Sequence, residues 1–398
     1  MITDGANGEH QFSEYNTSVR VSSQAVFEHQ VSENKSLQIK NSVAYFDRTL
    51  TTPNLDFVGN QWNSFTELNY SINKEKADWI FGANVYSNDF KEENTNLPRN
   101  QKDITTGIFM NNITDLSEEL ILESGFRMDY AADWGAFPLP RVSLLWKVND
   151  KFSSRLGGGL GYKIPDLFTE EAAVLNYEGI VPIDKTVLNA ERSYGLNWDL
   201  NYKTIIKDQI TFSINQLFYV TSIDNALLLN SRNDGLFEFA NANGNVLSQG
   251  AETNIKFTYK DFRWFINYAF INATLNYLPN NPQKPLTARH NAGSVLMYEN
   301  DEWRIGYEAY YTGKQTLSTG ETTQDFVLMG LLIQKHFEWG SPFINFENFT
   351  DRRQSRFSNE VLPPHDNPVF TEIYAPTDGF IFSAGVVIKP FGNHHHEH

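Results

Sequence analysis

Residues 302–313 (EWRIGYEAYYTG) alternate strictly between apolar and polar side chains, and this pattern strongly limits the possible folds. One face carries Trp303, Ile305, Tyr307, Ala309 and Tyr311, and the other carries Arg304, Gly306, Glu308, Tyr310 and Thr312. A period of two residues indicates a β-strand with one apolar and one polar face. The pattern recurs at 193–202, 209–215 and 141–148. Many such strands predict a transmembrane β-barrel with a polar lumen.

The composition agrees with a barrel and excludes several other classes. The chain is 14% aromatic, yet only 40% of its residues are hydrophobic, and its mean hydropathy is −0.43. The longest apolar run, near 326–333, is too short for a transmembrane helix. A net charge of −16 argues against nucleic-acid binding. The absence of cysteine excludes a disulfide framework and thiol chemistry.

Short and long connections alternate along the sequence, as they do in outer-membrane barrels. Short polar turns are predicted near 32–35, 73–76, 115–118, 149–151, 206–208, 260–261, 300–301 and 339–340. Longer connections are predicted at 49–61, 88–103, 163–191, 277–287, 314–323 and 352–378. This spacing predicts about 17 antiparallel strands, from one near 19–30 to one near 379–391, with no substantial helix.

Six motifs, in order, resemble the C-terminal part of a TonB-dependent outer-membrane receptor. They are FRMDY at 126–130 with Pro140 and Arg141 after it, the segment containing Gly161, Tyr162, Lys163 and Pro165, the segment containing Glu191 and Arg192, QGAE at 249–252, the segment containing Asn348 and Asp351, and the terminal Phe391. The match runs from about residue 65 onward. The resemblance implies TonB-dependent import of a scarce nutrient across the outer membrane of a Gram-negative bacterium.

The resemblance also implies a class of ligand. Iron–siderophore complexes are the leading expectation, and haem, cobalamin, other metals and glycans are the alternatives. The segment 163–191 contains no histidine, which counts against haem. The implied partners are the TonB complex, acting through a plug domain, and the lipids of the outer membrane, including lipopolysaccharide.

Family barrels have 22 strands around a plugged lumen, so the sequence is expected to be a partial receptor barrel at 1–391 followed by a His-rich tail at 392–398. Neither a plug domain nor a signal peptide is recognised in it. The first and last strands are therefore expected to leave an open seam or a strained parallel contact, around an unplugged lumen. An incomplete wall of this kind is not expected to transport anything by itself.

Several residues are candidate ligand contacts. Arg352, Arg353 and Arg356 match the geometry of carboxylate groups; the alternative is that they pair with Asp351 or contact lipopolysaccharide phosphates. Tyr177 and Tyr277 are loop aromatics that could stack on a flat ligand, or belong to an interfacial girdle. His394, His395, His396 and His398 suit Zn²⁺, Cu²⁺ or Ni²⁺; the alternative is a solvated periplasmic tail or a cloning residue.

Two other functional classes share the alternating pattern. A barrel enzyme requires a Ser–His or Asp–His constellation, and the few strand histidines offer none, so no enzymatic activity and no cofactor are expected. A passive outer-membrane porin is the second alternative, because a polar lumen serves it equally well.

Overall fold

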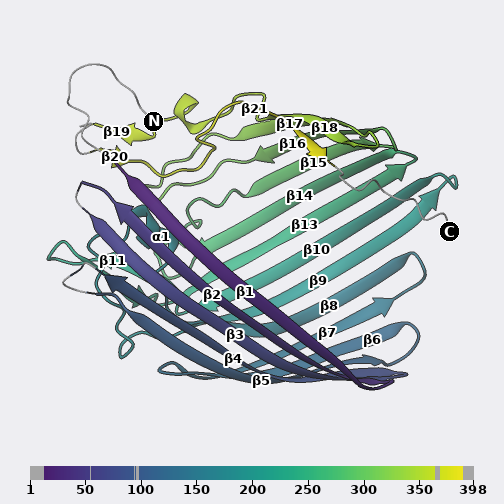
Figure 1. The fold of residues 1–398 in the computed structure, drawn as a ribbon, viewed down its shortest axis with the longest axis horizontal. Helices are drawn as coiled ribbons and strands as arrows, with labels where there is room; N and C mark the ends of the chain where they lie inside the picture. Colours follow the sequence, from purple (N-terminus) through teal and green to yellow (C-terminus); the bar gives the residue numbers. More distant parts are fainter. Residues whose placement is uncertain (1–12, 54, 94, 96–97, 364–367, 389–398) are drawn as a thin grey trace.

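A computed structural model describes residues 13–388, apart from positions 54, 94, 96–97 and 364–367. Strands make up 67% of the structure, and 17 of them form one curled antiparallel sheet (Figure 1). The predicted fold class and strand number are thereby confirmed. The strands of the sheet are β1 (Tyr15–Ser32), β2 (Lys35–Thr51), β3 (Asp56–Lys74), β4 (Ala77–Glu93), β5 (Gln101–Asp115), β6 (Leu120–Ala131), β7 (Gly135–Lys147), β8 (Phe152–Lys163), β9 (Glu191–Ile206), β10 (Ile210–Asp224), β13 (Asn245–Tyr259), β14 (Phe262–Leu275), β15 (His290–Glu299), β16 (Trp303–Thr312), β17 (Phe326–Lys335), β18 (Gly340–Glu347) and β21 (Ile381–Ile388).

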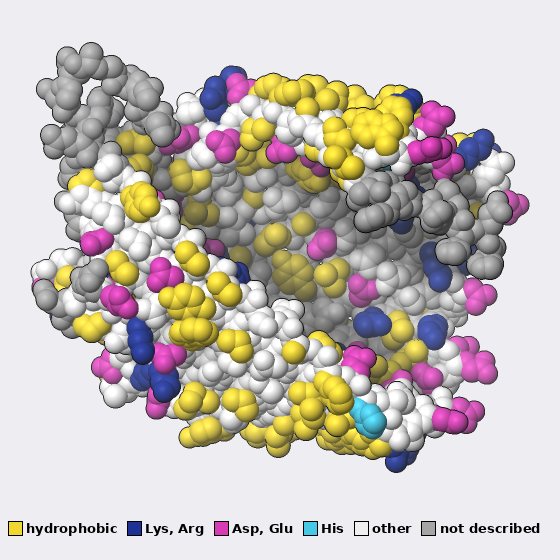
Figure 2. Space-filling view, in the orientation of Figure 1, with side chains coloured by type: hydrophobic (Ala, Val, Ile, Leu, Met, Phe, Trp, Pro, Cys, Tyr) yellow, Lys and Arg dark blue, Asp and Glu magenta, His cyan; other side chains and the backbone are white. Residues whose placement is uncertain are grey.

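Each strand of the sheet pairs with the next one along the chain. Two small hairpins stand outside this order: β11 (Leu227–Ser231) with β12 (Phe237–Asn241), and β19 (Val361–Leu362) with β20 (Val369–Phe370). Within the described residues, β1 pairs only with β2 and β21 only with β18. The expected open seam is present between them, and Figure 2 shows the hollow interior through it. Because the strand number is odd, β1 and β21 run in the same direction and cannot close as an antiparallel pair.

The two faces of the sheet differ in polarity, as the alternation predicts. On β9, Tyr194, Leu196 and Trp198 point outward and are 45%, 52% and 46% exposed. Asn197 and Asp199 alternate with them and point inward. Apolar side chains this exposed are unfavourable in water, whereas hydrocarbon accommodates them.

The inner face carries hydrogen-bonded polar networks. Asn215 on β10 donates from Nδ2 to Asp199 Oδ2 and Asn201 Oδ1 on β9, both at 2.8 Å. Nearer the short turns, Arg263 and Arg304 both pair with the Glu299 carboxylate. These groups need partners or water, so they suit a wet lumen.

Polar atoms on the outer face are paired locally. The Trp198 indole N–H donates to Ser154 Oγ at 2.9 Å, and the Trp264 indole N–H donates to Ser294 Oγ at 2.9 Å. Each serine is on a neighbouring strand, so a local partner satisfies an N–H that hydrocarbon could not.

Among the described residues no helix has the length and apolarity needed to cross a membrane. The only α-helix in them, α1 (Glu170–Val174), begins after Thr169, whose hydroxyl accepts from the Ala172 N–H at 3.2 Å. One 3₁₀ turn, η1 (Gln354–Arg356), follows β18.

The predicted short turns lie at one end of the sheet and the long connections at the other. Three connections at the long-loop end differ from the prediction, and one of them is a further short turn of residues 132–134 between β6 and β7. The expected loop 49–61 is mostly strand, because β2 and β3 stay paired up to Thr51 and Asp56. No long connection was predicted at 225–244, where the β11–β12 hairpin lies. Its Asn-Asp-Gly turn, with Gly235 at φ +83°, was an available signal.

Candidate functional site at the long-loop end

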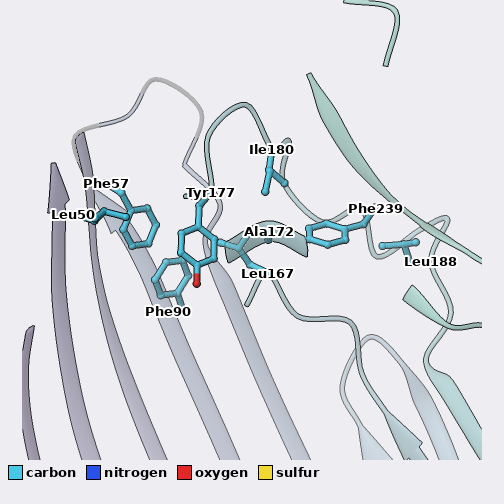
Figure 3. Packing of buried hydrophobic residues seen from close by; sticks show 9 residues of the cluster. All are labelled: Leu50, Phe57, Phe90, Leu167, Ala172, Tyr177, Ile180, Leu188 and Phe239. Carbon is cyan, nitrogen blue, oxygen red and sulfur yellow. The ribbon is translucent and has the colours of Figure 1, made fainter. Parts of the chain in front are cut away.

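The connection 164–190 folds against the strand ends and forms a compact apolar core with them, shown in Figure 3. We call this core and its polar contacts the rim assembly. Its buried members are Leu50, Phe57, Phe90, Leu167, Ala172, Tyr177, Ile180, Leu188 and Phe239. They come from β2, β3, β4, the connection itself and β12, so the loops of this end hold one another in place.

Tyr177 is part of this core. Its ring stacks on Phe57 with centroids 5.2 Å apart, meets Phe168 edge-on at 5.7 Å, and is 7% exposed. The prediction of an open loop aromatic or a girdle residue was wrong for this position, because local packing buries the ring. Asn176 and Tyr177 both have positive φ, at 51° and 64°, so the chain turns sharply here.

A buried ion pair lies beside the core. Arg99 Nε is 2.8 Å from Glu92 Oε2, and the two side chains are 8% and 3% exposed. The Arg99 backbone N–H also donates to this carboxylate at 2.9 Å. The guanidinium donates to the Tyr177 carbonyl oxygen and lies 5.7 Å from the centre of the Phe57 ring. The pair therefore joins the β4–β5 connection to 164–190, and sequence reasoning missed it because the partners meet only after folding.

Lys185 forms a second link. Its Nζ lies 3.0 Å from Asp103 Oδ1, 3.1 Å from Asp133 Oδ2 and 3.0 Å from the Lys102 carbonyl oxygen. Burial alone would lower the pKa of this ammonium, but the two aspartates raise it above its usual value. Lys185 therefore stays charged and fastens the end of the connection to β5 and to the β6–β7 hairpin.

The connection also encloses an acidic group. The Asp166 carboxylate accepts from the Phe168 N–H at 2.8 Å. Burial raises the pKa of this carboxyl, while the Phe168 N–H and the Lys163 charge oppose the shift.

The motif residues around 161–192 anchor the connection at both ends. Pro165 is almost fully buried, and its carbonyl oxygen accepts from Gln101 Nε2 at 3.4 Å. At the other end, Glu191 accepts from the Leu227 N–H at 2.7 Å, which ties β9 to the β11–β12 hairpin. Gly161 and Lys163 lie on the inner face of β8, opposite Ser193 and Glu191. Tyr162 and Arg192 both contact Phe137.

The second motif segment fixes the start of the 348–380 connection. Asn348 Nδ2 donates to the carbonyl oxygens of Arg352 and Asp378, at 2.8 and 3.2 Å. Asp351 pairs with both Arg353 and Arg356 and accepts from the Phe380 N–H at 3.2 Å. Both motif side chains therefore hold the loop closed.

Two candidate residues keep accessible side chains. Arg353 and Arg356 are occupied by Asp351, whereas the exposed Arg352 makes no side-chain hydrogen bond within the described residues. Tyr277 is partly exposed, and burial, followed by the nearby Glu171 charge, raises the pKa of its phenol. His394, His395, His396 and His398 lie outside the described residues. Within the described part of the chain, no cluster of side chains is suited to a metal ion.

The comparisons with known proteins agree with this architecture. Residues 3–341 match the family model described as "TonB dependent receptor-like, beta-barrel". The chain belongs to this receptor family. TonB-dependent receptors are transporters rather than enzymes, and they reside in the outer membrane of Gram-negative bacteria. A search of curated protein sequences found no match.

Solved structures share the fold at low sequence identity. The chain is similar to the copper transporter OprC, with a TM-score of 0.68 at 13% identity over 95% of this chain and 65% of that one. A mutant form of the ferric enterobactin receptor PfeA of Pseudomonas aeruginosa has a TM-score of 0.74 at 13% identity, over 94% of this chain and 62% of that one. The FrpB iron transporter of Neisseria meningitidis has a TM-score of 0.71 at 14% identity, over 94% of this chain and 63% of that one. The chain thus spans less than two thirds of the length of these receptors.

Proposed function

We propose that this chain forms part of the wall of an outer-membrane receptor that imports a scarce nutrient using energy delivered by the TonB complex. The observation that carries this proposal is the wall itself, apolar on its outer face and hydrogen-bonded and polar on its inner face. Residues 1–391 are assigned to the partial barrel and 392–398 to a tail. The open edges at β1 and β21 and the partial coverage of the solved receptors support the assignment to a partial barrel.

The proposed cargo is an iron–siderophore complex. Two of the similar structures are an iron transporter and a ferric enterobactin receptor, while a third is a copper transporter. Arg352 and Tyr277 are the proposed ligand contacts, because their side chains are accessible at the long-loop end. A guanidinium suits the carboxylate or catecholate oxygens of such a ligand.

The test is nutrient response and binding in cells that produce the complete receptor. Expression is expected to rise under iron starvation, and cells are expected to bind ⁵⁵Fe-labelled siderophore. Arg352→Ala should weaken that binding, while Arg232→Ala, in the exposed turn of the β11–β12 hairpin, serves as the matched control. A response only to copper, cobalamin or a polysaccharide would show that the iron assignment is wrong. Free diffusion of small solutes without dependence on TonB would instead identify a passive porin.

A further inference from the structure

The wall is interrupted between β7 and β8. These two fully described strands pair from Lys147↔Ser153 to Arg141↔Gly159 and no further, although β7 begins at Gly135 and β8 ends at Lys163. Beyond this point each strand keeps its other neighbour, β6 or β9. We call this interruption the step.

Two prolines explain where the pairing ends. Along β7 the backbone N–H groups point alternately to the two neighbouring strands: Lys147 N donates towards β6, to Glu119 O at 2.7 Å, and Val148 N donates towards β8, to Phe152 O at 3.0 Å. Even-numbered residues of β7 therefore donate towards β8. Pro138 and Pro140 occupy two of these positions and have no N–H to give. The ladder ends where the first of them is reached.

At the step the β6–β7 hairpin overlaps the ends of β8 and β9. Asp129 and Phe137 belong to the inner face of the β6–β7 hairpin, whereas Tyr162 belongs to the outer face of β8 by strand alternation. Nevertheless, the Tyr162 hydroxyl donates to Asp129 Oδ2 at 3.0 Å, and its ring stacks on Phe137 with centroids 3.9 Å apart. The ends of β8 and β9 therefore pass on the lumen side of the hairpin, which leaves a slot that faces outward.

Two hollows adjoin the step, and Tyr194 lines both of them. The hollow nearer the short-turn end of the sheet, which we call the notch, has a volume of about 570 Å³. It is mainly apolar, and Val142, Leu160 and Val220 are among the residues that line it. Gly158 contributes no side chain to this hollow, and a Cβ there would lie 2.8 Å from the Gly195 carbonyl oxygen. The hollow nearer the long-loop end, which we call the rim pocket, has a volume of about 800 Å³ and is mainly polar.

The rim pocket is suited to an uncharged polyhydroxylated group. Its cations, Lys185 and Arg192, are balanced by Asp133 and Asp224, so no excess charge favours a phosphate. Trp134 contributes an aromatic ring, whose indole N–H is held by Asp103 Oδ1 at 3.3 Å. A fixed ring beside hydrogen-bonding side chains can contact both the C–H face and the hydroxyls of a sugar.

Three further polar side chains line the same pocket. The side chains of Asn189, Arg192 and Asn243 make no hydrogen bond to other described residues. Asn241 Nδ2 holds the backbone on two sides of the pocket, because it donates to the carbonyl oxygens of Asn189 and Asn225 at 3.0 and 2.8 Å. The pocket is therefore largely preformed.

We propose that the step binds one glycolipid of the outer leaflet, with an acyl chain in the notch and a sugar of its headgroup in the rim pocket. The notch is continuous with the lipid-facing belt, and Gly159 lies roughly 20 Å from the short-turn end of β8, near the top of an apolar band about 25 Å tall. The sugar would thus lie where headgroups lie. This site depends on the proposed outer-membrane location and is independent of the cargo.

The test measures retained rough lipopolysaccharide. The complete receptor is placed in phosphatidylglycerol nanodiscs with or without rough lipopolysaccharide, released into mild detergent, and examined by native mass spectrometry. The protein should keep about one lipopolysaccharide molecule. Val220→Trp, which fills the notch, should lower this occupancy about tenfold, and Trp134→Ala or Asn243→Ala several-fold.

Matched controls separate this site from the general lipid shell. Val85→Trp changes another outward valine far from the step, and Asn230→Ala changes an asparagine outside the pocket. Both should keep full occupancy. Heat-modifiable electrophoretic migration reports folding, and the two rim-pocket variants carry the test if Val220→Trp does not fold.

Three results would overturn the proposal. They are equal occupancy in the Trp134→Ala, Asn243→Ala and control proteins, equal retention of phosphatidylglycerol and lipopolysaccharide, and full-affinity binding of the deacylated core oligosaccharide alone. Siderophore uptake is measured separately, so loss of the cargo assignment leaves this result readable.

Discussion

The wall and the rim assembly are held together by different forces. In the wall, neighbouring strands share backbone ladders that are interrupted at the step between β7 and β8, and side chains select which face meets water. In the rim assembly, the connection 164–190 has one five-residue helix and is held by a small apolar core, one buried ion pair and one lysine. Backbone ladders tolerate most single side-chain changes, whereas an assembly held by a few side chains depends on each of them. The following variants test that contrast.

The largest effect is expected from Glu92→Gln. The change leaves the Arg99 guanidinium buried without its counter-ion, and breaking such a pair costs about 3–5 kcal/mol. Residues 164–190 should lose protection in hydrogen-exchange mass spectrometry, while the wall keeps its heat-modifiable migration. Arg232→Met, in a pair whose partners are 39% and 49% exposed, is the control and should change protection little. Unchanged protection at 164–190 would show that the ion pair does not hold the loop.

The next effect compares two adjacent wall positions. Phe218 points outward and Leu217 points inward, opposite Asp199 and Glu252. Phe218→Arg should cost about 2–4 kcal/mol in a bilayer, whereas Leu217→Arg should be tolerated, because it gains water and two carboxylates. Urea unfolding in lipid vesicles measures both. Equal losses would show that these two faces do not separate lipid from water.

A smaller effect is expected from Lys185→Met. The ammonium is a quarter exposed, so losing its contacts with Asp103 and Asp133 should cost about 1–2 kcal/mol of local stability. Hydrogen exchange at 184–190 should rise, and the difference from the unchanged protein should shrink at high salt. Lys207→Met, in a short turn at the opposite end, should leave this segment unchanged. Equal hydrogen exchange at 184–190 in the two variants would show that the Lys185 contacts do not stabilise this segment.

The smallest effect is a pH dependence at Asp166. Burial raises the pKa of this carboxyl in the folded loop above its unfolded value, so the neutral acid favours the folded form. Its contribution is full below the unfolded pKa and declines as the pH rises through the folded pKa. Protection of 164–190, corrected for intrinsic exchange, should fall over this acidic range. Asp166→Asn should remove the fall, and a fall of equal size in that variant would assign it to another group.

Period-two alternation predicted the wall because each strand side chain has only two possible environments, lipid or water. The strand number, the antiparallel order and the side of the long loops followed from the spacing of the turns, and the open seam followed from the resemblance to a barrel of 22 strands. The motif residues Pro165, Glu191, Asn348 and Asp351 were singled out in the sequence by their resemblance to family motifs, and the structure shows them anchoring loops.

The sequence by itself therefore determined the wall, because strand periodicity and turn chemistry are local properties of the chain. Tertiary structure alone decided the rest. Tyr177 is buried and Arg99 is paired because segments distant in sequence pack together at the long-loop end. The step was also decided by tertiary structure. Two prolines in β7 mark a possible break in strand pairing. Only three-dimensional packing places Tyr162 on the lumen side of Asp129 and opens a slot in the wall.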